Sequence, residues 1–429
     1  MSVVRLLPRE PVRGEIADIA TEKSISHRAA ILSLLCAKTS RVRGYLRAED
    51  TLHTLQIAKN LGLSVQENDD ELILTPPKDI AEPACILDCG NAGTAMRLFC
   101  GLLAGVRGRF FVLDGDCYLR ARPMRRVVAP LVRMGAQIWG REGDSLAPLA
   151  VRGSALRATN YESPVASAQI KSAFVLAALQ ADGECVFAEP ELSRDHTERM
   201  LFAMGARLLR ENQTIRISPL QAPLEPLDLE IPSDPSSAFF FAVAAAIVPG
   251  SEIVLRNVLL NPTRIEAFEV LRKMGAQISF DAIPNAYDDV GDICVRYGGQ
   301  LSAIDVSERI AWLIDEIPAL AVAMACAKGT SRLTGAKELR VKETDRIAAV
   351  ATNLRACGIS VQELPDGFLI EGGDVRAATC DSFGDHRIAM SFAILGLLVP
   401  MTITDSGAMA VSFPTFLHLL SRFGMVEES

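Results

Sequence analysis

Ser167-Ala-Gln-Ile-Lys-Ser-Ala-Phe-Val-Leu-Ala-Ala-Leu-Gln-Ala-Asp-Gly183 begins with polar side chains, continues as an apolar run and ends at a glycine. Such a run is longer than an ordinary strand and too short to cross a bilayer, so it predicts a buried helix with a polar first turn. The pattern occurs six times in the 429 residues, and a repeat of this length indicates the architecture before any single motif does. The apolar runs cover residues 29–37, 95–106, 172–181, 238–248, 317–327 and 388–399.

A second helical pattern follows each apolar run and also ends at a glycine. Glycine accepts the left-handed backbone that commonly closes a helix, so its recurrence predicts helix ends. The successive gaps of 73, 70, 70, 83 and 66 residues give a period near 70. The closing glycines are Gly62, Gly135, Gly205, Gly275, Gly358 and Gly424.

Strand patterns separate these helices. Phe110–Leu113, Glu184–Phe187 and Glu252–Leu255 follow buried helices, and strand pairs follow the closing glycines. Each repeat is therefore predicted to be a βαβαββ unit with one buried and one exposed helix. Six such units predict an α/β fold in which three units per domain pack their apolar helices inward.

Two domains are expected because 429 residues exceed the size at which one hydrophobic core usually stops growing. The proline-rich stretch at residues 219–226 is the best candidate for the crossing between them. The opening residues precede the first repeat and are expected to pair with the second domain. We therefore expect one domain over residues 18–228 and another over residues 1–17 plus 229–429.

The composition is that of an acidic globular protein, with 49% hydrophobic and 22% charged residues and a net charge of −8. This charge argues against a nucleic-acid-binding surface, which is ordinarily basic. No glycine-rich phosphate loop or dinucleotide fingerprint occurs in the sequence, so no nucleotide cofactor is expected.

Ten cysteines are scattered singly through the chain, without the spacing of a zinc site. They are expected to be free thiols in a reducing compartment. Early arginine and proline residues interrupt the start of the chain, which therefore does not resemble a secretory signal. We expect a cytoplasmic protein with no metal, no membrane span and no nucleic-acid partner.

The polar residues in front of the apolar runs are the candidates for chemistry. Lys23-Ser-Ile-Ser-His-Arg28 combines two cations and two hydroxyls at a helix start, where free backbone N–H groups favour an anion. An alternative of equal weight is that Ser24 or Ser26 simply caps the helix.

A second front end, Gly90-Asn-Ala-Gly-Thr-Ala-Met-Arg97, is more informative. Gly93 permits close approach of a ligand to the backbone, while Asn91 and Thr94 offer hydrogen bonds. The alternative is an ordinary turn followed by a threonine cap.

Cations recur at equivalent positions of the repeats, although the protein is acidic. Two carboxylates, Asp315 and Glu343, stand beside them as acid or base candidates. The combination predicts a cleft that binds two small polyanions and moves protons between them, without metal or nucleotide. The cations are Lys23, Arg28, Arg97, Arg122, Lys171, Arg194, Lys342, Arg346 and Arg387.

Taken in chain order, the motifs resemble those of the 5-enolpyruvylshikimate-3-phosphate synthase (EPSP synthase) family. They are Lys23-Ser-x-Ser-x-Arg28, Gly90-Asn-Ala-Gly-Thr-Ala-Met-Arg97, Arg122-Pro123, Ser167-x-Gln169, Lys342-Glu-Thr-Asp-Arg346 and Asp385-His-Arg387. The resemblance implies transfer of the enolpyruvyl group of phosphoenolpyruvate to the 5-hydroxyl of shikimate 3-phosphate, with release of phosphate. It also implies a two-domain inside-out α/β barrel that acts as a monomer without a cofactor. The reaction would be a step in aromatic amino acid biosynthesis, and the resemblance implies that glyphosate inhibits it.

The resemblance carries site residues onto this chain motif by motif. The implied catalytic residues are Lys23, Lys342, Asp315 as the base and Glu343 as the proton donor. Those implied for shikimate 3-phosphate are Lys23, Ser24, Arg28, Ser167, Ala168, Gln169, Arg194, Asp315 and Lys342. Those implied for phosphoenolpyruvate are Lys23, Asn91, Gly93, Arg122, Gln169, Arg346 and Arg387.

The chain departs from the family pattern at two places. Many members carry a lysine where Val411 stands, two residues before Phe413-Pro414. Cys117, five residues before Arg122, resembles the loop cysteine of the sister family, the UDP-N-acetylglucosamine enolpyruvyl transferases. The alternatives to the shikimate reaction are therefore that sister activity and a non-catalytic anion-binding module.

Overall fold

The computed structural model describes residues 2–9 and 11–428, and the chain divides into two compact units. The N-terminal unit is Thr21–Ile231, and the C-terminal unit combines Met1–Ala20 with Pro232–Ser429. Each boundary lies three residues beyond the one expected from the sequence, after residues 17 and 228. The second expected boundary falls inside strand β14 (Asp228–Glu230).

The described residues form six four-stranded sheets, and a middle repeat of the N-terminal unit shows their plan. Its sheet has the order β6-β7-β9-β8, with β6 parallel to β7 and the other neighbouring pairs antiparallel. One helix lies between β6 and β7 along the chain, and another comes before β8. This is the predicted βαβαββ unit, so the fold prediction is confirmed.

The strands of the N-terminal unit belong to three such sheets. They are β3 (Ser40–Arg43), β4 (Ser64–Asn68), β5 (Glu71–Thr75) and β14; β6 (Leu87–Asp88), β7 (Phe110–Asp114), β8 (Gln137–Gly140) and β9 (Leu146–Arg152); and β10 (Asn160–Glu162), β11 (Cys185–Ala188), β12 (Leu208–Glu211) and β13 (Thr214–Ile217).

The strands of the C-terminal unit form the other three sheets. They are β2 (Arg13–Ile16), β15 (Glu252–Leu259), β16 (Gln277–Ile283) and β17 (Val290–Arg296); β18 (Asp305–Val306), β19 (Gly329–Leu333), β20 (Ser360–Leu364) and β21 (Gly367–Gly372); and β1 (Val3–Pro8), β22 (Ala378–Asp381), β23 (Met401–Thr404) and β24 (Gly424–Glu428).

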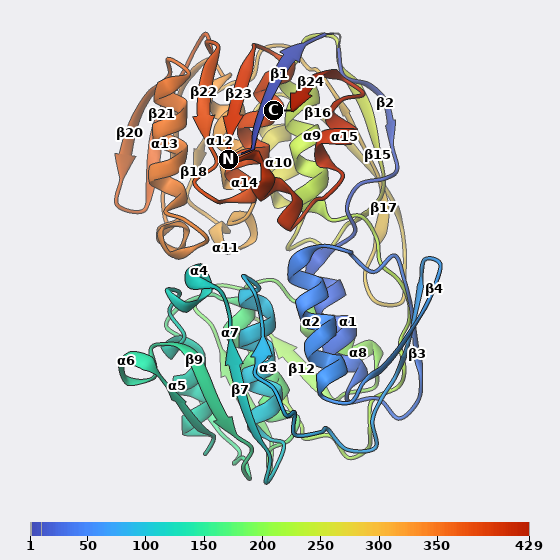
Figure 1. Cartoon of the computed structure of the whole chain (residues 1–429). Coiled ribbons are helices and arrows are strands. Elements are labelled where there is room, and N and C mark those ends of the chain that lie inside the picture. Colours follow the sequence, from blue (N-terminus) through green and yellow to red (C-terminus); the bar gives the residue numbers. More distant parts are fainter. Residues whose placement is uncertain (1, 10, 429) are drawn as a thin grey trace. The chain divides into compact units, whose positions relative to one another are not determined.

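Three sheets take a strand from outside their own repeat. Strand β14 pairs in parallel with β3, and β2 pairs in parallel with β15. Strand β1, at the blue end of the chain, lies between the red β23 and β24 (Figure 1). These long-range pairs satisfy backbone groups that would otherwise form an open sheet edge.

The six apolar runs form buried helices, as predicted. Their sequences are rich in Ala, Leu and Phe, and in α9 every one of the 13 residues is buried. A proline in the first turn and an aspartate cap favour the start of α9. The helices are α1 (Lys23–Ser33), α3 (Gly93–Ala104), α7 (Ala168–Ala178), α9 (Pro235–Ile247), α12 (Ile317–Ala325) and α14 (His386–Ala393).

Close packing of α3 against α7 depends on Gly101. A Cβ atom at this position would lie 2.1 Å from the carbonyl oxygen of Ala173, well inside van der Waals contact. The missing side chain therefore lets the two helix backbones approach each other and keeps their N-terminal turns in a fixed relation.

A second helix in each repeat ends shortly before the closing glycine. Five of these glycines have a positive φ, between +80° and +117°, as a helix-terminating glycine requires. Gly424 differs, because the last helix spans five residues and Gly424 already begins strand β24. The helices are α2 (Glu49–Asn60), α5 (Arg125–Arg133), α8 (His196–Ala203), α10 (Glu266–Lys273), α13 (Arg346–Ala356) and α15 (Phe416–Leu420).

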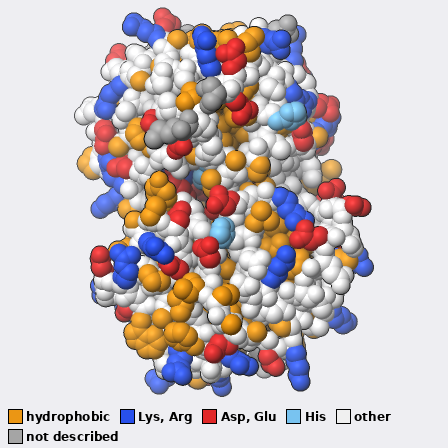
Figure 2. Space-filling view, in the orientation of Figure 1, with side chains coloured by type: hydrophobic (Ala, Val, Ile, Leu, Met, Phe, Trp, Pro, Cys, Tyr) orange, Lys and Arg blue, Asp and Glu red, His pale blue; other side chains and the backbone are white. Residues whose placement is uncertain are grey.

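Short helices complete the described chain, and none of the helices in residues 2–9 and 11–428 has the length and hydropathy needed to span a membrane. On the face shown in Figure 2, acidic and basic side chains are interspersed. The short helices are α4 (Cys117–Arg120), α6 (Arg141–Asp144), α11 (Ile310–Leu313), η1 (Lys337–Val341), η2 (Ile394–Leu397) and η3 (Ser406–Val411).

Candidate functional site

The polar front ends lie within or directly before the first turns of the apolar helices. Helix α1 begins at Lys23 and is capped by Glu22, whose carboxylate accepts a hydrogen bond of 2.6 Å from the Ile25 N–H. The alternative that Ser24 or Ser26 caps α1 is therefore wrong. Among the described residues, no side chain caps α3 or α7, so the N-terminal N–H groups of both helices are available to an anion.

Gly93, the first residue of α3, lies between two guanidinium groups. A Cβ atom there would be 3.1 Å from Nη1 of Arg97 and 3.1 Å from Nη1 of Arg122. Arg122 donates hydrogen bonds to both the backbone oxygen and the side-chain oxygen of Asn91. Asp116 accepts a hydrogen bond of 2.9 Å from the Asn91 amide and so fixes its orientation.

Gln169 joins the front of α7 to the front of α3. Its side-chain oxygen accepts a hydrogen bond from Arg97, and its amide donates one of 3.0 Å to the Thr94 hydroxyl. Ser167 and Ala168 lie in the same turn, as the cap position and first residue of α7. The predicted residues of the second and third repeats are therefore linked directly.

Arg28 joins α1 to the third repeat. Its Nε donates to the Thr197 hydroxyl at 2.7 Å, and its Nη2 donates to the Ser172 hydroxyl at 2.9 Å. Thr197 lies in the first turn of α8, three residues after Arg194. Lys23, at the start of α1, forms an ion pair of 2.9 Å with Asp50.

Lys171 does not match its expected role as one of the anion-binding cations. Its side chain is 2% exposed, and its Nζ lies 2.8 Å from Glu189 and 2.8 Å from Glu198. Burial by itself lowers the pKa of Lys171, but these two carboxylates raise it above its ordinary value. Lys171 is thus a buried, neutralised cation that holds α7 in place.

In the C-terminal unit, Arg346 is the centre of the second cluster. This side chain is 1% exposed, and its Nε and Nη2 lie 2.7 and 3.3 Å from the Asp385 carboxylate. Nη2 also donates to Glu343 at 2.6 Å, while Nη1 donates to Asp315 at 3.3 Å. Burial alone lowers the pKa of Arg346, but the three carboxylates raise it above the ordinary value, so it remains a fixed positive charge.

Asp315 lies between three cationic side chains. Its Oδ1 is 3.7 Å from Lys342 Nζ, 3.7 Å from Arg387 Nε and 3.3 Å from Arg346 Nη1. Arg387 also donates to the Asp315 backbone oxygen at 3.2 Å. All five residues predicted in this unit are therefore brought together.

The C-terminal cluster has the composition of an acid–base site for an anionic substrate. The side chains of Asp315 and Glu343 are 19% and 22% exposed, and both contact the same arginine. A carboxylate beside fixed cations can accept or deliver a proton while the cations hold a charged ligand. Nowhere in the part of the chain that the structure describes do three His, Cys, Asp or Glu residues gather as a metal site would require.

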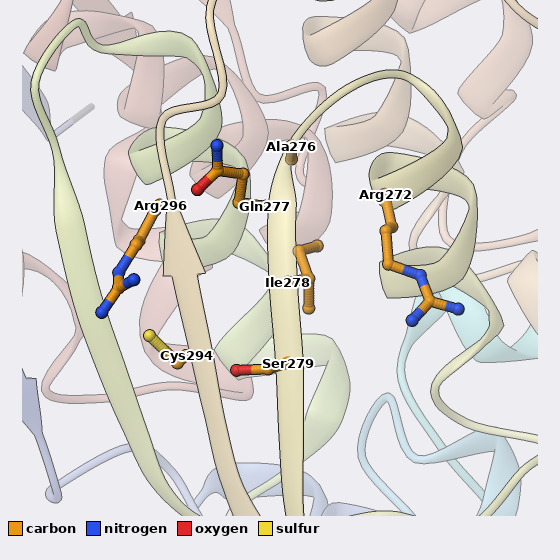
Figure 3. A pocket seen from close by; sticks show the side chains of 7 residues that line it. All are labelled: Arg272, Ala276, Gln277, Ile278, Ser279, Cys294 and Arg296. Atoms are coloured by element: carbon orange, nitrogen blue, oxygen red, sulfur yellow. The ribbon is translucent and has the colours of Figure 1, made fainter.

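A pocket of about 360 Å³ lies elsewhere in the C-terminal unit, on β16, β17 and the end of α10 (Figure 3). Its two arginines are already engaged, Arg272 with Glu269 and Arg296 with Glu252. None of the predicted site residues lines it. Its lining residues are Arg272, Ala276, Gln277, Ile278, Ser279, Cys294 and Arg296.

The sequence identified some partners of the predicted cations, such as Asn91, Gln169 and Asp315, but not Asp50 or Asp116. Asp50 pairs with Lys23 and Asp116 orients Asn91, and both roles depend on contacts made only in the folded chain. Glu316, directly before the apolar run at residues 317–327, was not a candidate either. In the structure it is buried and contacts Arg264.

Val411 and Cys117, the two departures from the family pattern, lie in short helical segments. Val411 is the last residue of η3, and Cys117 is the exposed first residue of α4. All ten cysteines of the chain are free thiols.

Comparisons with known proteins identify the family. The sequence model of EPSP synthase (3-phosphoshikimate 1-carboxyvinyltransferase) matches residues 7–420. The chain is 58% identical over 422 residues to the 3-phosphoshikimate 1-carboxyvinyltransferase of Campylobacter concisus, covering 98% of each protein. It is 56% identical over 432 residues to that of Nitratiruptor sp., covering 100% of this chain and 99% of the relative.

The fold comparison agrees with the sequence comparison. The structure of EPSP synthase from Acinetobacter baumannii matches with a TM-score of 0.88 and 37% identity, and the match covers 100% of both chains. The architecture of this chain is therefore that of a known fold, and the chain belongs to the EPSP synthase family.

Proposed function

We propose that the two clusters described above carry out the reaction of the EPSP synthase family in this chain. This reaction transfers the enolpyruvyl group of phosphoenolpyruvate to the 5-hydroxyl of shikimate 3-phosphate and releases phosphate. The observation that carries the assignment of roles is that Asp315 and Glu343 share the buried cation Arg346. One cation thus organises both a base and an acid.

In this proposal the N-terminal unit supplies most of the groups that bind shikimate 3-phosphate. Arg28 is held by three hydrogen bonds, and the uncapped start of α7 presents N–H groups beside a polar side chain. Such a preorganised guanidinium and helix N-terminus suit a phosphate or hydroxyl-rich ligand. The residues proposed are Lys23, Ser24, Arg28, Ser167, Ala168, Gln169 and Arg194, together with Asp315 and Lys342.

Phosphoenolpyruvate carries a carboxylate and a phosphate, and so needs several cations. Gly93 leaves its Cβ position empty between Arg97 and Arg122, where an anionic group would meet two guanidiniums and the start of α3. Arg346 and Arg387 supply positive charge in the other unit. The residues proposed are Lys23, Asn91, Gly93, Arg122, Gln169, Arg346 and Arg387.

The proton steps follow from the two carboxylates. Asp315 accepts the proton of the 5-hydroxyl as that oxygen bonds to C2 of phosphoenolpyruvate, and Glu343 donates a proton to C3. The resulting tetrahedral adduct returns a C3 proton to the Glu343 carboxylate as the bond from C2 to the phosphate oxygen breaks, so the double bond re-forms and phosphate leaves. Lys23 and Lys342 assist this elimination by stabilising the departing phosphate.

Localisation, oligomeric state, cofactor requirement and domain boundaries complete the proposal. The ten free thiols are consistent with a reducing cytoplasm, where the enzyme acts as a monomer without metal or cofactor. The division into domains at residues 17/18 and 228/229 remains a prediction, and it differs by three residues at each boundary from the compact units described above.

Phosphate release in the presence of both substrates tests this function. Purified protein with phosphoenolpyruvate and shikimate 3-phosphate should release phosphate, and either substrate alone should not. Release with UDP-N-acetylglucosamine in place of shikimate 3-phosphate, abolished by Cys117→Ser, would support the sister activity. Binding of both substrates without release would support a non-catalytic anion-binding module.

A further inference from the structure

Glu316, the residue after the candidate base, belongs to a second buried network, formed with Ser236 and Arg264. It is 2% exposed and occupies the cap position of α12. Its carboxylate accepts a hydrogen bond from the Ser236 hydroxyl, in the first turn of α9, and lies 3.4 Å from Arg264. A buried carboxylate with these partners requires an explanation, because burying a charge is costly unless the charge is paired and hydrogen-bonded in good geometry.

Arg264 is the cation of this second buried network. It is 1% exposed, and its Nη2 lies 2.8 Å from the Asp234 carboxylate and 2.9 Å from the Ser236 hydroxyl. Asp234 also caps α9, through a hydrogen bond of 2.7 Å from the Ser236 N–H. Arg264 thus ties the start of α9 to the start of α12.

Arg264 and Arg346 have equivalent surroundings in successive repeats. Each arginine lies at the start of the second helix of its repeat and pairs with a carboxylate at the front of its own apolar helix. Each also pairs with the cap residue of the next apolar helix, which is Glu316 for Arg264 and Asp385 for Arg346. The carboxylate that Arg346 contacts within its own repeat is that of Asp315. Arginines therefore contact the side chains on both sides of the peptide bond between Asp315 and Glu316.

The Asp315 carboxylate lies 3.3 to 3.7 Å from three cationic neighbours, Lys342, Arg346 and Arg387. Its segment, between α11 and α12, is only three residues long, so rotation of the backbone at Glu316 would redirect the Asp315 side chain. The buried Glu316 therefore determines the direction of the partly exposed Asp315 side chain.

We infer that Glu316 and Arg264 are positioning residues, which hold the Asp315 carboxylate in the direction needed to accept the substrate proton. This inference rests on the proposed function, because it assumes that Asp315 is the base. A displacement of about 1 Å in a reacting group can cost up to about 100-fold in rate. Loss of the Glu316 anchor should therefore lower kcat, while both substrates still meet the same cations.

Steady-state kinetics of Glu316→Gln and Glu316→Ala test the inference. We expect kcat to fall by about tenfold to 100-fold in Glu316→Ala, with both KM values within about twofold of the wild type. Glu316→Gln should lose less, because its amide oxygen still accepts from Ser236. This rescue by the conservative variant distinguishes positioning from a need for negative charge.

The matched control is Asp288→Asn, another carboxylate-to-amide change at a buried site of the fourth repeat. Asp288 accepts a hydrogen bond of 2.6 Å from Asn261. It should lose stability without a specific loss of kcat. An unchanged kcat in Glu316→Ala, or an equal loss in the control, would overturn the inference.

Crystal structures of the wild type, Glu316→Ala and Glu316→Gln provide a readout independent of activity. The Asp315 carboxylate should turn away from Arg346 in Glu316→Ala and stay near its wild-type position in Glu316→Gln, and an unmoved carboxylate in Glu316→Ala would also overturn the inference. Failure of the proposed function looks different: the wild type would release no phosphate, or Asp315→Asn would retain full activity.

Discussion

Replacing His27 by asparagine tests whether the folded protein keeps this buried imidazole, in the first turns of α1, unprotonated. His27 lies between Ser26 and Arg28, is fully buried, and has its Nδ1 2.6 Å from the Thr54 hydroxyl. Burial lowers the pKa of His27 from 6.5 to about 3, and the neighbouring Asp50 only partly opposes this effect. The folded chain therefore keeps this imidazole neutral at pH values where the unfolded chain protonates it.

The sign of the resulting pH dependence follows from the lowered pKa. Stability contributed by neutral His27 is complete above pH 6.5 and is lost as the pH falls toward 3, since only the unfolded state takes up the proton. The difference of about 3.5 pH units corresponds to about 5 kcal/mol over the whole window, at about 1.4 kcal/mol per unit. Between pH 7 and pH 5 the loss should be about 2 kcal/mol.

Urea unfolding at pH 5, 6 and 7 measures this loss. The chain has two tryptophans, so Trp312→Phe leaves Trp139 as a reporter of the N-terminal unit. His27→Asn in that background should flatten the pH dependence by about 2 kcal/mol between pH 7 and pH 5, whatever its effect on stability at pH 7. His418→Asn, at an exposed histidine, is the control and should change the slope little.

The reasoning fails if wild type and His27→Asn lose the same stability between pH 7 and pH 5. That result would mean that His27 binds protons equally in both states and that α1 opens readily to water. Since α1 carries Lys23 and Arg28, its first turns would then be too mobile to form the proposed binding site.

Three further predictions concern the two clusters. Gly93→Ala places a Cβ atom 3.1 Å from the Arg97 and Arg122 guanidiniums. Glyphosate inhibition constants and the KM for phosphoenolpyruvate should show that glyphosate binding is weakened more than phosphoenolpyruvate binding, and equal weakening would contradict the steric argument. Glu343→Gln removes the proposed proton donor and should lower kcat by at least about 100-fold in the phosphate assay, with the fold retained by circular dichroism. Lys171→Met leaves two buried carboxylates without their cation and should cost about 3–5 kcal/mol in urea unfolding, whereas a solvated lysine would cost almost nothing.

The architecture was predictable because its signals are local. Each apolar run, each helix-closing glycine and each strand pair can be recognised within a few tens of residues, and their repetition specifies the βαβαββ unit. The strands that complete the first and last sheets were less predictable. Strand β14 pairs with β3 and β1 pairs with β23, across about 190 and 400 residues of chain, and such pairings leave no local pattern.

Several candidate side chains at the fronts of the apolar helices contact one another, as Arg97 and Gln169 do, but their roles in binding and catalysis remain predictions. The expectation was wrong for Lys171, because Gln169 and Lys171 are two residues apart on α7 and therefore point to nearly opposite sides of the helix. Gln169 meets Arg97, whereas Lys171 is buried against Glu189. The partner carboxylates Asp50, Glu189 and Glu198 were missed for a related reason, because ion pairing depends on tertiary contacts that the sequence spacing does not specify.

The pairing of cations with carboxylates also explains how an acidic protein can hold sites for two polyanions. An unpaired guanidinium in the environment of Arg346, which is 1% exposed, would be strongly destabilising, so carboxylates accompany it. The side chains of Arg387 and Lys342 are 10% and 29% exposed, and each lies 3.7 Å from Asp315. In the proposed site the fully buried cation organises the cluster while these two less buried cations bind the ligand, so the net charge of the whole chain does not decide what the site attracts.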